Sequence, residues 1–287
     1  MSNYLKKFVV KPGSKIRLKH FDPGFHGKHE SHKAALSKIQ TNLQKMDELQ
    51  YRMYAENKHS LLIVLQGLDA AGKDGVVRLV FTGMNPEGCV AVNFKEPTRE
   101  ELAHDFLWRV HPHVPGKGSV AIFNRSQYED VLVARVHGLV SKKVWSKRHD
   151  EINDFERLIA TENDTAILKF FLHISKEEQL ARFKKRLDDP ARQWKISDSD
   201  YKEREYWGDY IMAFEDVLTR TSTDYAPWFI IPSNHKWFRD LAISEIIVRQ
   251  MEDMDMQLPK PTVNLVAIRR EYHQAADEEK SGRRKGR

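Results

Sequence analysis

An apolar run that leads directly into a glycine-rich turn constrains this chain more than any other feature. Residues 61–66 are apolar enough for a buried strand, and residues 67–73 follow at once as Gly-Leu-Asp-Ala-Ala-Gly-Lys. The G-x-x-x-x-G-K spacing lets successive backbone N–H groups surround an anion at the start of a helix, and the lysine adds a mobile positive charge. The sequence therefore predicts a P-loop. The residues expected to bind phosphate are Gly67, Ala70, Ala71, Gly72 and Lys73.

A short glycine-lysine match can arise by chance, and glycines between a strand and a helix can serve packing alone. The context of this match favours the functional reading. The motif follows a strand-like run, and residues 76–81 place apolar side chains at helical spacing after it.

Two carboxylates make this P-loop unusual. Asp74 occupies the position of the Ser or Thr whose hydroxyl normally reaches a magnesium ion, and Asp69 lies inside the loop. A carboxylate in a phosphate-binding loop is costly unless a metal ion lies between the two anions. We therefore expect these acids to organise a metal ion in the loop, Asp74 to lie beside the substrate, and the substrate to be rich in phosphate. The expected cofactor is Mg²⁺, with Mn²⁺ as the alternative.

Composition narrows the class of protein. Among 287 residues, 47 Lys and Arg outnumber 41 Asp and Glu, which favours a polyanionic partner. Residues 6–19 and 280–287 carry part of this excess and are expected to be solvated arms, because basic and aromatic residues do not alternate in them as in a single-strand-binding platform. We therefore expect no specific nucleic-acid partner. No membrane span or secretory leader is visible, so we expect a cytoplasmic protein.

Strand-like runs that alternate with helical stretches predict an α/β fold with a parallel sheet. We expect a basic arm over residues 1–30, a single P-loop domain over residues 31–260 and a charged tail over residues 261–287. An amphipathic helix is expected from Leu36, Ile39, Leu43, Met46 and Met53. It is expected to pack on its own domain, because a coiled-coil dimer seam would cover too few heptads. Besides residues 61–66, the expected strands are residues 89–94, 119–123, 166–172 and 228–231.

Ligands bind beyond the carboxyl ends of the strands in such sheets. There the sequence places Asn124 and Arg125, whose planar guanidinium suits bidentate contact with phosphate. Ser126 and Glu129 fit either the site or a helix capping box, and the sequence does not decide between them. Lys95 follows another strand and is either an anion ligand or a solvated lysine.

The segment from about 176 to 207 is expected to be a helical lid. Its first helix should open with Ser175 and Glu178 as a capping box. Leu180, Phe183 and Leu187 form the expected buried stripe, while Arg182 and Arg186 share another face with Lys185 nearby. Basic helix faces are often only solvated. A lid that supplies positive charge to a transition state is the preferred reading. Trp207, Tyr210 and Phe214 beyond it are expected to be core residues, and the sequence does not place a nucleotide base.

Taken together, residues 67–74, 94–98 and 123–133 and the arginine-bearing lid resemble the polyphosphate kinase 2 family, and the resemblance covers most of the chain. It implies a three-layer, thymidylate-kinase-like P-loop kinase fold with a central parallel sheet of about five strands. It also implies phosphoryl transfer between inorganic polyphosphate and AMP, ADP or ATP with magnesium, by a homo-oligomer, either a dimer or a tetramer.

By the same resemblance, Asp69 would organise the metal, Lys73 and Arg125 would hold the transferring phosphoryl group, and Arg182 would come from the lid. Many members carry Asp where this chain has Asn124. Asn at this position resembles the branch that phosphorylates both AMP and ADP.

Two other functions fit parts of the sequence. An ATP-dependent nucleoside monophosphate kinase would use the same fold, and a non-catalytic polyanion- or nucleic-acid-binding protein would use the same positive charge. The intact Gly72 and Lys73 argue against a decayed loop. A nucleotide phosphate acceptor is already ionised near neutral pH, so no general base is expected.

Overall fold

The computed structural model describes residues 4–27 and 31–285, which divide into two compact units, residues 1–256 and 257–287. In the first unit, the described residues form one sheet of five parallel strands in the order β2-β3-β1-β4-β5. Every expected strand is present, and each observed boundary lies within one or two residues of the expected one. The strands are β1 (Ser60–Gln66), β2 (Cys89–Asn93), β3 (Val120–Asn124), β4 (Thr165–His173) and β5 (Trp228–Pro232).

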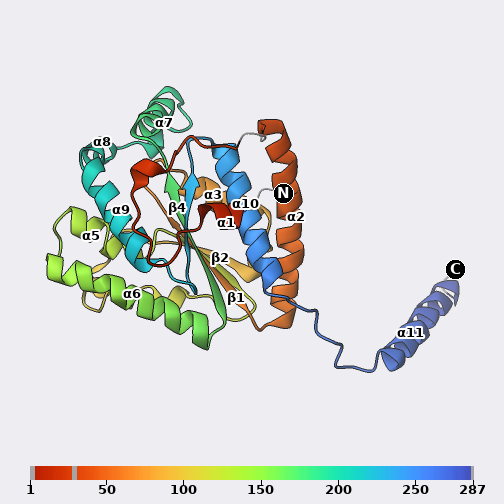
Figure 1. Cartoon of the computed structure of the whole chain (residues 1–287). Helices are drawn as coiled ribbons and strands as arrows, with labels where there is room; N and C mark the ends of the chain where they lie inside the picture. The colour runs from red at the N-terminus through yellow and green to blue at the C-terminus, as the bar shows by residue number, and fades with distance from the viewer. Residues whose placement is uncertain (1–3, 28–30, 286–287) are drawn as a thin grey trace. The chain divides into compact units, whose positions relative to one another are not determined.

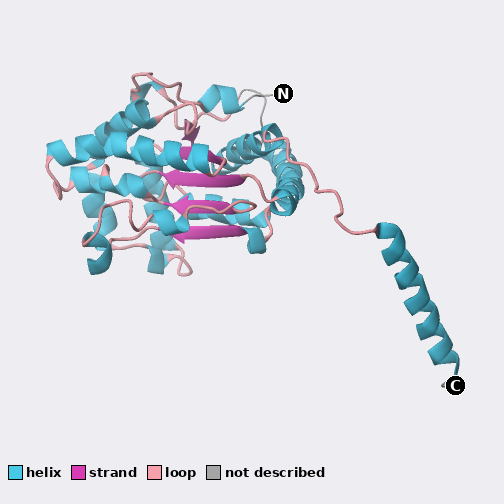
Figure 2. Cartoon of the chain, turned by 90° about the horizontal axis from the view of Figure 1, so that it is seen from below, coloured by secondary structure: helices cyan, strands magenta, loops and turns pink. Residues whose placement is uncertain are grey.

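Helices cover both faces of this sheet, as Figures 1 and 2 show. Alternate residues of each strand point to opposite faces. Leu61 and Ile63 of β1 therefore pack against one set of helices, and Leu62 and Val64 against the other. The first face is covered by α1 (Tyr4–Phe8), α2 (His32–Glu56), α3 (Lys73–Thr82) and α10 (Lys236–Asp253), and the second by α6 (Lys142–Glu162) and α9 (Trp207–Thr221). The chain thus has the three-layer α/β fold of a P-loop kinase.

Shorter helices lie in the connections. The α-helices among them are α4 (Arg99–Leu102), α5 (Val133–Val136), α7 (Lys176–Asp188) and α8 (Asp198–Glu205). The 3₁₀ helices are η1 (Leu18–His20), η2 (Pro86–Gly88), η3 (His111–His113), η4 (Gln127–Asp130) and η5 (Gln193–Lys195). Helices α7 and α8 with η5 occupy the segment in which a helical lid was expected.

The amphipathic helix expected after the arm is α2, which lies along α10 in Figure 1. Ile39, Leu43, Met46 and Met53 are buried as expected. Leu36 was wrongly included in the stripe, because its side chain is 54% exposed. The packing of α2 on α10 favours the intrachain reading over a coiled-coil seam.

The N-terminal segment is not the solvated arm that its basic composition suggested. Val10, Ile16 and Leu18 are buried, and Val10 N donates a 2.8 Å hydrogen bond to Trp228 O beside a bridge from Val9 to Phe229. The expectation was wrong because a few apolar residues spaced irregularly among lysines can pack on a preformed sheet without any helical or strand period. Residues 1–3 and 28–30 lie outside the described part of the arm.

Residues 257–287 form the second unit, in which α11 (Leu265–Lys285) is a helix. The sequence predicts a charged, solvated tail here, and nearly all side chains of residues 265–280 are exposed. In the part of the chain that the structure covers, no helix is both long and apolar enough to cross a membrane.

Candidate active site

The glycine-rich loop after β1 has a backbone that only particular residues can adopt. Gly67 and Gly72 have φ angles of 154° and 110°, and Ala70 has a φ of 61°. A Cβ atom at Gly67 would lie 2.9 Å from the carbonyl oxygen of Leu172, and one at Gly72 would lie 2.0 Å from Nη1 of Arg239. The two glycines are therefore required by the fold of the loop and by the arginine that covers it.

Lys73, the first residue of α3, folds back over this loop. Its Nζ donates a 2.6 Å hydrogen bond to Gly67 O and lies 3.5 Å from Leu68 O. Burial lowers the pKa of Lys73, and Asp69 opposes that effect. The ammonium group is thus held beside the anion-binding loop, where it can donate a hydrogen bond to a phosphate oxygen.

Arg125 joins the loop to the end of β3. Its Nη2 lies 3.4 Å from Oδ1 of Asp69, and its Nη1 lies 3.8 Å from Oε2 of Glu129. The backbone of Arg125 has a φ of 62°, which is uncommon for a residue with a side chain and is found most often at functional sites. Asp69 and Arg125, which the sequence placed on different strand ends, are therefore brought together.

Ser126 and Glu129, for which the sequence left a capping box and the site open, do not form the capping box. Ser126 Oγ accepts from Tyr128 N over 3.3 Å, and the carboxylate of Glu129 faces Arg125 instead. Of the two readings of Glu129, the structure favours the site. In contrast, Thr98 and Glu101 form a capping box at the start of α4.

Asp74 and Asn124 also meet. Asn124 Nδ2 donates a 3.0 Å hydrogen bond to Oδ1 of Asp74, and Nζ of Lys195 lies 3.8 Å from Oδ2 of the same carboxylate. The side chain of Asp74 is 76% exposed, so most of it stays open to a ligand.

Helix α7 braces the loop. The guanidinium of Arg182 donates to Ala70 O at 2.7 Å, to Ala71 O at 2.9 Å and to Asn234 O at 3.1 Å, with a further bond to Ser233 O. Its Nε donates to Glu178 over 2.7 Å. In this conformation Arg182 is a buried support of the P-loop rather than a free lid arginine.

This brace corrects the buried stripe expected on α7. Phe183 is buried, but Leu180 and Leu187 are 46% and 47% exposed. Gln179 and Arg182 take the buried positions, and Gln179 Nε2 donates to Asp69 O over 3.0 Å. The apolar periodicity was misleading because the surface that α7 meets is a row of loop carbonyl groups.

Sequence reasoning missed two cations at the start of α10. Arg239 is buried and its guanidinium lies over Gly72 and Gly75, while it also pairs with Asp240 at 2.7 Å. Burial lowers the pKa of Lys236, and nearby Arg182 and Arg239 lower it further. The rule that located Arg125 would have located them, because α10 begins just after the carboxyl end of β5.

A cavity of about 660 Å³, here called the cationic cavity, opens over the loop. Cations dominate its lining, and Glu96 with Asp69 and Asp74 supplies the carboxylates. The cationic side chains that line it include some that the sequence analysis singled out and some that it did not. They are Lys73, Arg78, Lys95, Arg125, Arg182, Lys185, Arg186, Arg192, Lys195, Lys236 and Arg239.

A second cavity of about 400 Å³, here called the aromatic cavity, meets the first at Asp69, Glu96 and Arg125. Trp207, Tyr210 and Phe214 of α9 line it. The expectation that these three are core residues is right for Tyr210 and Phe214, which are buried, but they also form a cavity wall. Its polar lining includes Glu129, His137, Gln179, Ser199, Glu203 and Arg204.

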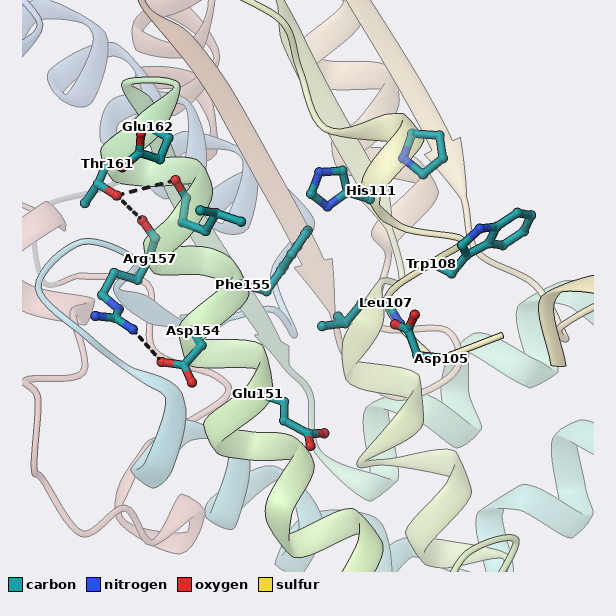
Figure 3. Close-up of a pocket in the computed structure, with 12 residues that line it drawn as sticks. Asp105, Leu107, Trp108, His111, Glu151, Asp154, Phe155, Arg157, Thr161 and Glu162 are labelled. Carbon is teal, nitrogen blue, oxygen red and sulfur yellow. Dashed lines mark hydrogen bonds and ion pairs between the residues drawn. The ribbon is translucent and has the colours of Figure 1, made fainter. Parts of the chain in front are cut away.

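A third cavity, of about 950 Å³, lies between residues 105–112 and helix α6 (Figure 3). Its polar lining is mainly acidic, and its one arginine, Arg157, already pairs with Asp154 at 2.8 Å. It contains no P-loop residue. This cavity therefore has the wrong charge and position for a phosphate-rich ligand.

Comparison with known proteins agrees with this geometry. The family described as polyphosphate kinase 2 (PPK2) matches residues 26–259. An AMP/ADP-polyphosphate phosphotransferase of Meiothermus ruber is 48% identical over 261 residues, which cover 90% of this chain and 96% of the relative. An ADP-polyphosphate phosphotransferase of Rhodopseudomonas palustris is 40% identical over 273 residues, covering 90% and 93%. The crystal structure of polyphosphate kinase 2 from Arthrobacter aurescens TC1 superposes with a TM-score of 0.89 at 38% identity, over 92% of this chain and 95% of the other.

Proposed function

The chain belongs to the polyphosphate kinase 2 family, and we propose that it phosphorylates AMP to ADP and ADP to ATP with inorganic polyphosphate as the donor. It is a polyphosphate:nucleotide phosphotransferase. We assign polyphosphate as the donor because eleven cationic side chains and three carboxylates line the cationic cavity. A single triphosphate does not need so extended a positive surface, whereas a phosphate chain carries a charge on every unit.

The acceptor nucleotide is assigned to the aromatic cavity. Its volume of about 400 Å³ lies in the range of small-ligand sites, and its aromatic wall suits a base. The two cavities share Asp69 and Arg125, so a phosphate of the nucleotide and the end of the polyphosphate chain would meet there. This arrangement would allow a phosphoryl group to pass from polyphosphate to the nucleotide, or in the reverse direction.

We assign a divalent cation, Mg²⁺ in the first place and Mn²⁺ as the alternative, to the junction of the cavities. The carboxylate oxygens of Asp69, which lines both cavities, suit a hard cation. Over the described residues no cluster of three or more acidic, His or Cys side chains forms a complete cage. That finding fits magnesium, which is usually held by one or two carboxylates together with substrate phosphates. When bound, the cation would offset the charge on the phosphates.

The mechanism then depends on positioning and charge. A nucleotide phosphate is already an ionised nucleophile, so the site needs no general base. Lys73 and Arg125 would hold the transferring phosphoryl group in line between the two ligands, and Asp69 would hold the divalent cation. Asn124, Asp74 and Lys95 would contact the ligands at the strand ends, and Lys185 and Arg186 would bind the rest of the chain of phosphates.

The lid is proposed to act through two kinds of cation. Arg182 keeps the loop carbonyls in place and so positions the backbone N–H groups that bind phosphate. Arg186 lies further out, where its Nη1 donates to Lys195 O over 3.2 Å and leaves donors for polyphosphate. A homo-oligomer, either a dimer or a tetramer, stays a prediction from the family resemblance.

The test compares donors. Purified protein, Mg²⁺ and AMP are incubated with either long-chain polyphosphate or ATP, and the nucleotides are separated over time. The proposal expects ADP and then ATP from polyphosphate, at initial rates well above those with ATP as donor. Faster transfer from ATP would instead indicate an ATP-dependent nucleoside monophosphate kinase. No transfer, with tight salt-sensitive RNA binding, would indicate a binding protein.

A further inference from the structure

Two oppositely charged side chains, Glu156 of α6 and Lys169 of β4, meet in the core behind the active site. Lys169 Nζ lies 2.5 Å from Oε2 of Glu156, and neither side chain has any exposed area. Neither residue lines the cationic or the aromatic cavity. Replacing such a buried pair by apolar residues is often neutral or stabilising, so stability alone does not explain it.

All but one of the side-chain hydrogen bonds from this pair to other residues go to one short segment, η4. Glu156 Oε1 accepts from Gln127 Nε2 at 3.0 Å and from the Tyr128 hydroxyl at 2.8 Å. Lys169 Nζ donates to the same hydroxyl at 2.9 Å and to Thr221 O at 2.6 Å. The charged pair therefore holds two consecutive residues of η4.

Those two residues lie between Arg125 and Glu129. Gln127 and Tyr128 are fully buried, whereas Arg125 and Glu129 line the active-site cavities. Arg125 also has the φ of 62° that a residue with a side chain rarely adopts. Such a conformation persists only where the surrounding structure determines it. The bonds from Gln127 and Tyr128 to Glu156 and Lys169 hold the turn from its core side, and Arg125 N also donates to Leu65 O of β1.

We propose that Glu156 and Lys169 are a positioning pair for the phosphoryl-transfer reaction, which holds residues 125–129 so that Arg125 and Glu129 face the transferring group. The inference rests on the proposed function, because that function assigns Arg125 to the phosphoryl group. A misplacement on the order of 1 Å, caused by a change away from the chemistry, can cost about 100-fold in rate.

The main test is the double variant Glu156→Leu/Lys169→Met. It removes both charges together and keeps the volume, so it leaves no unpaired buried charge. We expect a lower melting temperature than that of the unchanged protein, because the Gln127 amide, the Tyr128 hydroxyl and Thr221 O lose buried hydrogen bonds. We expect kcat with polyphosphate and AMP to fall about 10- to 100-fold, and KM for polyphosphate to change less than about threefold. The cations of the cationic cavity are untouched by this variant.

Met53→Ala serves as the matched control. Met53 is fully buried on the opposite face of the sheet, so its truncation should lower the melting temperature without moving residues 125–129. At a temperature well below both transitions, this variant should retain the kcat of the unchanged protein. Equal losses of kcat in both variants would show a general effect of stability and would overturn the inference.

A mutant cycle with Arg125→Ala separates positioning from other effects. If the pair acts through Arg125, adding the double substitution to Arg125→Ala should lower kcat by less than about threefold. If the losses of kcat from Arg125→Ala and from the double substitution multiply, the inference is overturned. A folded double variant with full kcat would also overturn it. Full activity of Arg125→Ala alone would instead contradict the proposed function, so the two failures are distinguishable.

Tyr128→Phe keeps the inference testable if the double variant does not fold. It removes one hydroxyl from the network and leaves the ion pair intact. We expect a severalfold lower kcat, of the order of 3- to 10-fold, and no further loss in the Arg125→Ala background. An unchanged kcat would overturn the inference.

Discussion

Asn124 donates a hydrogen bond from its Nδ2 to Oδ1 of Asp74 over 3.0 Å. The bond links the end of β3 to the first turn of α3, beside the glycine-rich loop. A neutral amide at this place satisfies one carboxylate oxygen and leaves the other to Lys195 and to a ligand. A carboxylate at position 124 would instead face Asp74 at the same short distance.

Asn124→Asp should therefore make the enzyme depend more steeply on the divalent cation. The substitution replaces the hydrogen bond to Asp74 by repulsion between two carboxylates, and a bound cation offsets that repulsion. We expect activity to fall by about tenfold at low Mg²⁺ and to be largely restored at high Mg²⁺. Initial rates over a range of Mg²⁺ concentrations check this, and a loss independent of Mg²⁺ would contradict it.

Asp69→Asn should separate chemistry from binding. The substitution keeps the shape and removes the charge that we assign to the metal, so kcat should fall by about 100-fold or more. The Kd for polyphosphate should stay the same or decrease, because one negative charge leaves the junction of the cavities. Single-turnover rates and equilibrium binding measure the two quantities. Equal losses in turnover and affinity would remove the case for a catalytic metal role.

Arg182→Lys should lower both stability and kcat, whereas Arg186→Ala should mainly raise KM for polyphosphate. Lysine cannot replace a buried guanidinium that serves several carbonyl oxygens, so Arg182→Lys should lower the free energy of unfolding by about 2–4 kcal/mol and also lower kcat. Arg186→Ala should leave stability within about 0.5 kcal/mol and raise KM for polyphosphate. Denaturant titrations with steady-state kinetics distinguish them. A stable Arg182→Lys with only a raised KM would show a lid arginine instead of a brace.

Because of Lys73 and Lys236, alkaline pH should raise the stability of the free protein and lower its affinity for polyphosphate. Burial lowers both pKa values from 10.5. Between each lowered pKa and 10.5 the unfolded chain binds more protons than the folded one, so these groups make the free protein more stable as pH rises. Polyphosphate affinity should fall over the same range, because the ammonium charges are lost.

Binding and unfolding measured from about pH 8 to pH 10.5 check this pair of effects. Lys236→Arg keeps its charge throughout that range and is the matched control. Its polyphosphate affinity should fall less, by a difference on the order of tenfold at the alkaline end. Parallel pH profiles of the variant and the unchanged protein would exclude a role for Lys236.

The sheet was predictable because each strand carries its own local signal. A buried parallel strand is a continuous apolar run, and this pattern located all five strands around the glycine-rich turn. The errors arose where burial is decided by a partner far away in sequence. Leu36 and Leu187 fit a helical stripe but have no apolar surface opposite them, while Val10 fits no stripe and packs beside Trp228.

The site was predictable where it is built from motifs and less so where it is built from packing. Lys73 and Arg125 follow strands in recognisable segments, and their meeting with Asp69 follows from the parallel sheet. The aromatic cavity was not predictable, because its walls come from many separate segments whose spacing carries no common period. The position of Arg239 beyond the end of β5 could have marked it as a candidate, but nothing in the sequence indicates that its guanidinium covers Gly72.

The most direct test of the proposed mechanism is a crystal structure of the protein with Mg²⁺, a polyphosphate chain and AMP. We predict polyphosphate in the cationic cavity, with its terminal phosphate within hydrogen-bond distance of Lys73 and Arg125. We predict AMP in the aromatic cavity, with its phosphate directed at the same point beside Asp69. Polyphosphate bound away from the glycine-rich loop, or AMP bound in the cationic cavity, would contradict the assignment.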